Sequence, residues 1–280
     1  MNVDNVLKYL VCPKTKNSLV KRGNFLWDSS GKNKYKIINN KIYFIDPVKA
    51  NNFEDSFKFK IKKFFGNFYH NFLVKYFGPG LHINLNKLII KYQKPGGINI
   101  NLGSGNQIIN SDFLNLDFVD YENVDIICDL HNLPFKNNSI DFSFSYGVLE
   151  HLRNVYEVEN EIFRVSKKKS ATMHIVPFLY PYHASPHDFF RFTIFGMNEL
   201  FSRWSIVHQF NIQGPFSLLI ILITRIFSNI FSFNIGFLRI LIFYLILLII
   251  FPIKYLDYFF INKKNVLEFS PVFLNIFTKN

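Results

Sequence analysis

From residue 98 onward, short apolar runs alternate with stretches in which apolar residues recur every three or four positions. Short apolar runs bounded by turn signals are typical of buried strands, and the periodic stretches are typical of helices. The sequence predicts helices over Val148–Val165 and Gly196–Phe201. It predicts strands over Ile98–Leu102, Phe113–Leu116, Val124–Cys128, Phe142–Ser145, Thr172–Val176, Ser205–Phe210 and Pro271–Phe277. This alternation favours a parallel sheet covered by helices on both faces.

Residues 1–47 carry shorter apolar runs separated by polar turns. This pattern predicts a small β-rich domain that ends at Pro47. Its apolar runs are Leu7–Val11, Phe25–Trp27, Lys36–Ile38 and Ile42–Ile45.

Residues 48–95 are expected to form a basic amphipathic linker or cap. Between residues 53 and 77, phenylalanine and isoleucine recur every three or four positions with lysines between them. That spacing predicts a helix with one apolar and one basic face, ended by Gly78-Pro79-Gly80. Two interpretations stay open: a helix that covers the core of the next domain, and a helix that lies on a membrane surface.

Residues 216–260 form an apolar insert before the last predicted strand. Its uncharged run Ile240–Ile253 is shorter than the ~20 residues that a membrane-spanning helix needs. If the strands on either side join one sheet, the insert begins and ends on the same side of a bilayer, which excludes a single crossing. We expect a peripheral membrane contact with Arg225, Arg239 and Lys254 at the lipid headgroups. A hairpin through the bilayer and a buried core element remain alternatives.

Composition adds constraints on partners and location. The net charge of +12 is compatible with a nucleic-acid partner, but the abundance of Lys, Asn, Ile and Phe indicates an AT-rich genome, so that partner is not favoured. Cys12 and Cys128 are the only cysteines, which excludes a disulfide framework and a cysteine zinc site. The stretch MNVDNVLKYL lacks the features of a signal peptide, and we expect a cytoplasmic location.

Glycines and polar side chains follow the predicted strands at the points where these strands end. Gly103 and Gly105 follow the first strand, Asp117 the second, Asp129 the third and Tyr146 the fourth. In an open α/β sheet, ligands bind at the carboxyl ends of the strands. The sequence therefore predicts a ligand site at this edge, where glycines let the backbone approach the ligand closely.

The stretch "NLGSGN…LNLDFVD…DIICDLHNLPFKNNSIDFSFSYGVLEHL" resembles the class I S-adenosylmethionine-dependent methyltransferases, in particular the type-11 group, over residues 97–210. The resemblance implies a methyltransferase domain over residues 96–280, an activity of class EC 2.1.1, and S-adenosylmethionine as the cofactor. It also implies an α/β, Rossmann-like sheet of seven strands with helices on both faces and an antiparallel last strand.

The resemblance also implies which residues hold the cofactor. The two glycines would approach its methionine portion, and Asp117 would accept hydrogen bonds from the ribose hydroxyls. Asp129 would face the adenine amino group, the Leu130 backbone the ring nitrogen, and Tyr146 the sulfonium. Asn101 stands where many relatives carry an acid. The full set is Asn101, Gly103, Gly105, Asp117, Asp129, Leu130 and Tyr146.

A second polar cluster, "VPFLYPYHASPHDFFRFT", follows the fifth predicted strand. We expect His187 to deprotonate an acceptor hydroxyl, with His151 as the alternative base. We expect Tyr180, His183, Asp188 and Arg191 to bind the acceptor, beside Tyr182. No metal is expected, because histidines spaced like His183 and His187 are ligands mainly on a helix and prolines oppose one here. The alternatives are a loop whose polar groups satisfy one another and a His151 that caps or packs.

The pattern "LKYLVCPKTKNSL…YKIINNKIYFI" resembles the small zinc-ribbon-like domain of transfer-RNA methyltransferase activators. Only Cys12 remains of the possible ligands, which implies a metal-free version. Type-11-like enzymes of glycan gene clusters show a similar "PHDFFR"-like stretch. The combined expectation is O-methylation of a lipid-linked sugar, surface-glycan precursor or other lipidic acceptor at the membrane surface. The alternatives are a transfer-RNA-directed methyltransferase and a non-catalytic docking protein with the same fold.

Overall fold

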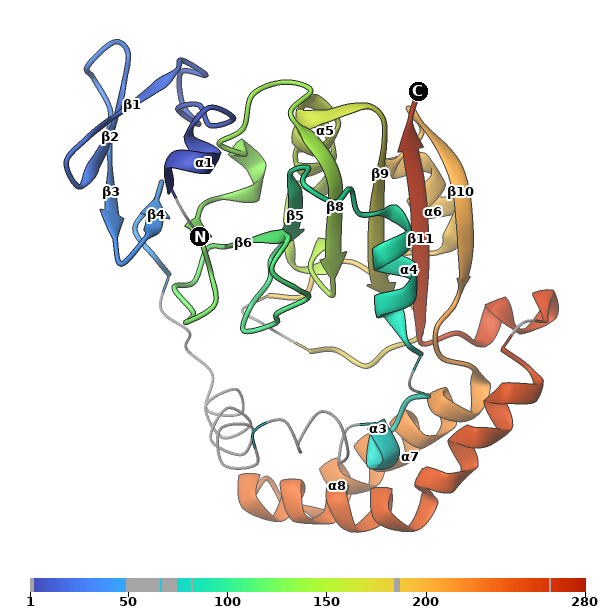
Figure 1. The fold of residues 1–280 in the computed structure, drawn as a ribbon. Coiled ribbons are helices and arrows are strands. Elements are labelled where there is room, and N and C mark those ends of the chain that lie inside the picture. The colour runs from blue at the N-terminus through green and yellow to red at the C-terminus, as the bar shows by residue number, and fades with distance from the viewer. Residues whose placement is uncertain (1–2, 49–65, 67–74, 82, 184–186, 262) are drawn as a thin grey trace.

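The computed structural model describes residues 3–48, 66, 75–81, 83–183, 187–261 and 263–280, and it forms one mixed sheet flanked by helices (Figure 1). The sheet has eleven strands in the order β1-β2-β3-β4-β7-β6-β5-β8-β9-β11-β10. These strands are β1 (Leu19–Arg22), β2 (Phe25–Asp28), β3 (Lys34–Ile38), β4 (Lys41–Tyr43), β5 (Asn99–Leu102), β6 (Phe113–Asp117), β7 (Ile126–Ile127), β8 (Ile140–Tyr146), β9 (Ser166–Pro177), β10 (Trp204–Asn211) and β11 (Val272–Lys279).

The predicted strands from residue 98 onward are confirmed in type and within two residues at nearly every boundary. Neighbouring strands from β7 to β9 run parallel, and β11 runs antiparallel to both β9 and β10. The chain leaves β5 to one side for β6 and reaches β8 on its other side, so the strand order reverses at β5. A ligand crevice forms at the carboxyl ends of strands beside such a reversal.

The expected count of seven strands is wrong for the sheet as a whole. Strands β1 to β4 pair antiparallel, and β4 then pairs parallel with β7 through Ile42 opposite Ile126. Strands β1 to β4 therefore extend the sheet that carries the strand-end residues. The apolar run Leu7–Val11 does not form a regular strand: the chain forms the helix α1 (Val3–Leu7), and isolated bridges join Leu10 to Phe135 and Val11 to Ser18.

The interior of the N-terminal unit is closed by hydrogen bonds. The buried Cys12 Sγ lies 3.0 Å from the Tyr35 hydroxyl. Asp28 accepts hydrogen bonds from Ser30, Asn33 and Thr15. These bonds lower the pKa of its carboxyl, and Ser30 has the largest effect. Cys12, Tyr35 and Asp28 therefore all have hydrogen-bond partners within the N-terminal unit.

Helices cover both faces of the sheet, as predicted. On one face, α5 (Val155–Val165) packs Val158 and Ile162 against the cluster that contains Ile100. On the other face, α4 (Leu85–Tyr92) places Ile89 in the cluster that contains Phe142. The short helix α6 (Ile194–Leu200) adds Met197 and Leu200 to the first cluster, whereas the short helix α3 (Lys75–Phe77) lies away from the sheet (Figure 1). Most of the predicted helix over residues 53–77 lies outside the described residues.

The predicted helix Val148–Val165 is divided in the structure. The 3₁₀ turn η3 (Leu149–His151) comes first, and α5 begins only at Val155. The backbone carbonyl of Glu150 accepts hydrogen bonds from the backbone N–H groups of Phe189 at 2.7 Å and Phe190 at 3.3 Å. Because this carbonyl bonds to the loop after β9 instead of continuing a helix, the first turn is held apart from α5.

Between β10 and β11 the chain forms α7 (Pro215–Phe231), α8 (Gly236–Ile250), η4 (Phe251–Phe259) and η5 (Lys264–Phe269). The run expected to be too short to span a membrane belongs to one continuous helical segment of 24 residues, Gly236–Phe259, because η4 follows α8 without a break. Asp257, fully buried, accepts hydrogen bonds from the backbone of Gly214, Phe216 and Ser217 and so caps α7. This cap ties η4 to the start of α7.

Lys254 does not lie where lipid headgroups would be, contrary to expectation. Its side chain is buried, and Nζ donates hydrogen bonds to the backbone carbonyls of Gly78 at 2.7 Å and Lys75 at 3.3 Å. Burial lowers the pKa of this ammonium to about 8. The lysine therefore joins η4 to the segment before α4.

Candidate functional site

The structure brings together the glycine loop after β5 and the acid after β6. The backbone N–H of Gly105 donates to Asp117 Oδ2 at 2.8 Å, and that of Val119 donates to Oδ1 at 2.9 Å. Gly103 and Gly105 both have positive φ, 60° and 53°. A Cβ on Gly103 would lie 2.7 Å from Val148, whereas one on Gly105 would meet nothing within 4 Å. The Val148 side chain thus fills the space next to Gly103, whereas the space next to Gly105 contains no protein atom within 4 Å of that Cβ position.

Asp117 is suited to bind a diol. The residue is 5% exposed, and burial raises the pKa of its carboxyl although the backbone N–H groups of Val119, Gly105 and Phe118 act in the opposite direction. Oδ2 accepts a hydrogen bond from Gly105 and Oδ1 one from Val119, and a carboxylate can accept further hydrogen bonds. These acceptor positions suit the two hydroxyls of a ribose.

Asp129 lies at the end of β7 as predicted, but it has a partner that the sequence interpretation missed. Its Oδ1 accepts a hydrogen bond from the His131 backbone at 2.9 Å and lies 2.6 Å from His131 Nδ1. This contact lowers the pKa of Asp129 and raises that of His131. Leu130, which is buried, begins the 3₁₀ turn η2 (Leu130–Asn132) that Asp129 caps. The motif "DLH" was the available signal.

Asn101 points its amide at the neighbouring strand. Its Nδ2 donates to Asn115 Oδ1 at 3.1 Å, and the side chain is 1% exposed. Tyr146, at the end of β8, is 41% exposed as a residue. Its hydroxyl end is nevertheless crowded by protein, and this desolvation, together with Tyr180 and Glu150, raises its pKa to about 12. The phenol therefore stays neutral at physiological pH.

In the loop after β9, two of the predicted acceptor residues bind each other. The guanidinium of Arg191 forms a two-pronged ion pair with Asp188 and donates to the Tyr180 carbonyl at 3.0 Å. Burial opposes ionisation of Asp188, but the hydrogen bonds from Arg191 outweigh it and lower the carboxyl pKa. Asp188 also accepts from the His183 backbone at 2.9 Å. The pair holds His183 and Tyr180 in position.

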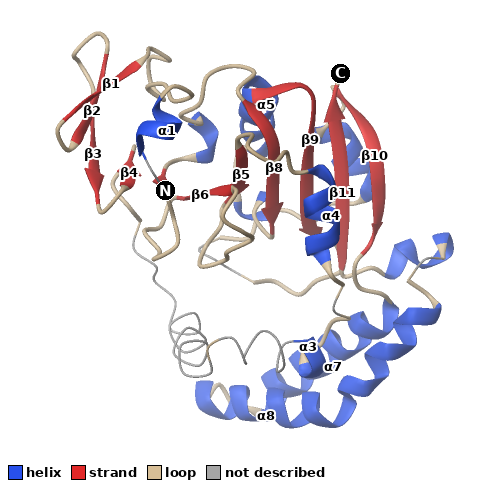
Figure 2. Ribbon diagram, in the orientation of Figure 1, coloured by secondary structure: helices blue, strands red, loops and turns tan. Residues whose placement is uncertain are grey.

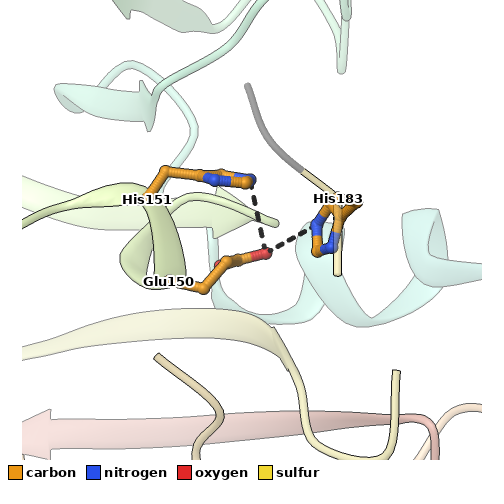
Figure 3. A group of neighbouring side chains, drawn as sticks. All are labelled: Glu150, His151 and His183. Carbon is orange, nitrogen blue, oxygen red and sulfur yellow. Dashed lines mark ion pairs between the residues drawn. The ribbon is translucent and has the colours of Figure 1, made fainter. Parts of the chain in front are cut away.

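The residue that this loop covers is Glu150, which the sequence interpretation overlooked (Figure 3). Glu150 is completely buried, and neither carboxylate oxygen has a hydrogen-bond partner among the residues that the structure describes. His183 Nε2 lies 3.6 Å from Oε1 and His151 Nε2 lies 3.8 Å from the same oxygen. The two imidazole rings are 5.0 Å apart. Three titratable groups therefore meet beside the end of β8.

His187, the first choice as catalytic base, is placed differently. Its backbone carbonyl lies 2.5 Å from His151 Nδ1, while its exposed ring packs against Phe189 at 5.6 Å. Within the described part of the chain, no hydrogen bond or ion pair involves this ring. Tyr182 is 70% exposed. The cluster is thus built by His151 and His183, and the His187 ring lies outside it.

Residues 103–173 match the family model described as a methyltransferase domain. This segment of the chain is therefore similar to a methyltransferase domain. The match begins directly after β5 and ends within β9, and it supports S-adenosylmethionine as the cofactor. Gly105, Asp117 and Glu150 all lie inside the matched segment, whereas the loop after β9 follows it.

Solved structures with similar folds include phosphoethanolamine N-methyltransferase 2 of Haemonchus contortus in complex with S-adenosyl-L-methionine, with 16% identity, a TM-score of 0.48, and coverage of 80% of this chain and 57% of that one. The cyclase SpnF has 11% identity and a TM-score of 0.45, and the match covers 70% of this chain and 80% of that one. A SAM-dependent methyltransferase from Aquifex aeolicus has 15% identity and a TM-score of 0.39, and the match covers 55% of this chain and 92% of that one. No curated protein matches the chain significantly. The residue assignments therefore rest on this chain's own geometry.

A further histidine, His174, lies in the core behind the site and gives a pH prediction. It is fully buried on β9 between Ser145 and Thr172, and burial lowers its pKa to about 3. An unfolded histidine titrates near 6.5, so below that pH the unfolded chain binds a proton that the folded chain refuses. Stability should fall by about 1.4 kcal/mol per pH unit between about 6.5 and 3. The free energy of unfolding can be measured by denaturant titration at each pH. Between pH 6.5 and 5 it should fall by about 2 kcal/mol less in His174→Gln than in the wild type.

His208→Gln is the matched control, because His208 is exposed on β10. It should show the same pH dependence as the wild type. Parallel curves for the wild type and His174→Gln would contradict the assignment of a neutral, buried His174.

Proposed function

We propose that the chain is an S-adenosylmethionine-dependent methyltransferase that O-methylates a lipid-linked sugar, a surface-glycan precursor or another lipidic acceptor. It would act in the cytoplasm, bound peripherally to the membrane. One observation carries the lipidic part of the proposal: the methyltransferase site and the apolar insert share one end of the sheet. In Figures 1 and 2, β5, β8 and β9 point towards the side on which α7 and α8 lie.

Strand pairing supports the same placement. Pro177, the last residue of β9, lies opposite Val272, the first residue of β11. Asn211, the last residue of β10, lies opposite Phe273. The insert therefore leaves and rejoins the sheet where β9 ends, next to the loop that carries His183. Because both flanking strands belong to one sheet, the insert would enter and leave a bilayer on the same side.

The surface of the insert favours lipid contact. Among the described residues, more than half of the exposed large hydrophobic side chains lie between residues 216 and 260. Phe237 is 72% exposed, Ile249 77% and Phe259 72%. Only 6% of the most apolar stretch of Gly236–Phe259 is buried. A contiguous apolar surface of this kind is typical of a membrane or protein contact.

S-adenosylmethionine supplies a methyl group on a positively charged sulfur. Asp117 would accept hydrogen bonds from its ribose, and the open backbone beside Gly105 would receive its methionine portion. Asp129, with one oxygen engaged by His131, would offer the other to the adenine amino group. Tyr146 would lie near the sulfonium, which an aromatic face stabilises.

The chain would act on the acceptor mainly by positioning it. The loop after β9, held by the pair of Asp188 and Arg191, would orient the acceptor hydroxyl towards the methyl carbon. His187 would remove the hydroxyl proton, since its ring is exposed next to the cluster, with His151 as the alternative. The N-terminal unit would be a metal-free relative of the zinc-ribbon-like activators and would serve to extend the sheet.

The test is transfer of label from methyl-labelled S-adenosylmethionine to a cell lipid extract by the purified full-length chain. Label should enter the organic phase in an alkali-resistant product, as expected of an ether linkage. Label that enters transfer RNA instead would favour the alternative acceptor. Binding of S-adenosylmethionine without transfer to any lipid fraction would contradict the lipidic acceptor and leave the cofactor assignment intact.

A further inference from the structure

The contacts of Glu150 differ from those of an ordinary ion pair. In this same chain, His131 approaches Asp129 to 2.6 Å. The two imidazole nitrogens that face Glu150 stop at 3.6 and 3.8 Å, outside hydrogen-bond distance. An ionised carboxylate that is fully buried without hydrogen bonds is costly. The arrangement leaves a gap between one oxygen and two nitrogens that points to a missing positive partner.

The tautomers of the two histidines sharpen this point. His151 Nδ1 lies 2.5 Å from the carbonyl oxygen of His187, so in the neutral ring Nδ1 carries the proton and donates it. His183 Nδ1 faces the Pro181 carbonyl at 3.4 Å and Asp188 Oδ2 at 3.5 Å, which selects the same tautomer. In both rings Nε2 then presents a lone pair to Glu150. Three lone pairs facing one another are unfavourable unless a cation lies between them.

We propose that Glu150, His151 and His183 form a binding site for a divalent first-row transition-metal cation. Their ligand atoms all lie within 4.8 Å of one another. A cation bound at about 2.1 Å from each ligand requires separations of about 3 to 3.5 Å between ligand atoms, so the side chains need to close by less than about 2 Å. Figure 3 shows both rings directed at the same carboxylate oxygen.

The ligand types and their outer contacts fit this class of cation. Two imidazoles and one carboxylate suit zinc, cobalt, manganese or iron, whereas magnesium prefers oxygen ligands. Metal-bound histidines donate their other ring N–H to a carbonyl or carboxylate, which fixes the ring. The His187 carbonyl does this for His151, and the Pro181 carbonyl and Asp188 do it for His183. Three protein ligands leave coordination positions open.

The role of the cation, unlike the site itself, rests on the proposed function. An acceptor hydroxyl bound at an open coordination position of the cation would be held beside the end of β8. The cation would lower the pKa of that hydroxyl. The His183 side chain is 30% exposed, so the site is accessible from the loop side. Cation binding needs neither cofactor nor acceptor, so it can be measured independently of methyl transfer.

The test is calorimetric titration of the chelator-treated full-length chain with ZnCl₂ and CoCl₂, with MgCl₂ for comparison. We expect one zinc or cobalt ion per chain and much weaker magnesium binding. Glu150→Gln and His183→Ala should each weaken zinc binding at least about tenfold. Zinc at a hundred times its Kd should raise the Tm of the wild type by about 5 °C and leave that of Glu150→Gln nearly unchanged.

Glu199→Gln and His208→Ala are matched controls on exposed positions away from the cluster, and both should bind zinc like the wild type. Circular dichroism of Glu150→Gln, which keeps the side-chain size, establishes that it is folded. Equal zinc affinity in the wild type and Glu150→Gln would overturn the site. So would an absence of zinc and cobalt binding, which would indicate that a shared proton, not a metal, lies between Glu150 and the imidazoles.

Discussion

Replacement of Asp117 by alanine should weaken binding of S-adenosylmethionine by about 10- to 150-fold, the loss expected when hydrogen bonds to a charged group worth about 1.5–3 kcal/mol are removed. Two physical effects act together. The ribose hydroxyls lose their acceptor, and the backbone N–H groups of Gly105 and Val119 lose theirs, so the loop that receives the cofactor is no longer held. Isothermal titration calorimetry with the purified protein measures the change directly.

Asp120→Ala is the matched control. Asp120 lies three positions further on, but it is exposed and binds Lys41 at 2.7 Å and Tyr43 at 2.8 Å, away from the glycine loop. It should bind the cofactor like the wild type. A folded Asp117→Ala variant with unchanged affinity would remove the carboxylate from the cofactor site and with it the main support for the strand-end assignment.

The central strands were predictable because their signal is local. In β5 and β8 apolar residues alternate with polar ones, and this period-two pattern predicts a strand, although both strands are buried along nearly their whole length. The pairing of β4 with β7 was not predictable in this way. It joins residues about eighty positions apart, and no local pattern distinguishes a strand that pairs within a small domain from one that extends a neighbouring sheet.

The candidate site was predictable only in part for the same reason. Each strand-end residue could be found because strand ends meet at one edge of the sheet. Glu150 could not, since its burial depends on the return of the loop after β9, where the backbone of Phe189 and Phe190 bonds to the Glu150 carbonyl. His187 was favoured over His183 because spacing alone does not reveal which ring turns towards Glu150. The mutual pair of Asp188 and Arg191 is likewise a product of the loop's conformation.

The predicted length of the apolar helix in the insert depended on where that helix was assumed to end. The run Ile240–Ile253 was counted between charges, on the assumption that Lys254 would reach water. In the structure, Lys254 is buried against the carbonyls of Gly78 and Lys75, and Asp257 caps α7. Both charges are therefore satisfied inside the protein, and the helical segment continues past them. The outer surface is more apolar than the sequence count suggested.

The second large effect concerns this surface. The wild-type chain should co-sediment with anionic liposomes, and Phe237→Glu combined with Ile249→Glu should reduce that binding by about 100-fold or more. Burying each apolar side chain in lipid contributes about 1.5–3 kcal/mol, and both residues are more than 70% exposed. The two glutamates also repel anionic headgroups. Sedimentation over a range of lipid concentrations gives the partition coefficients that measure this loss.

Phe195→Glu separates membrane binding from general surface stickiness. Phe195 is 84% exposed, more than either residue of the double variant, but it lies on α6, outside the insert. This variant should bind liposomes like the wild type. If it loses binding equally, the attachment is not specific to α7, α8 and η4; if the wild type ignores liposomes altogether, the insert contacts protein instead. Either result would remove the physical basis for a lipidic acceptor, because the proposal depends on the apolar surface and the end of β9 facing the same bilayer.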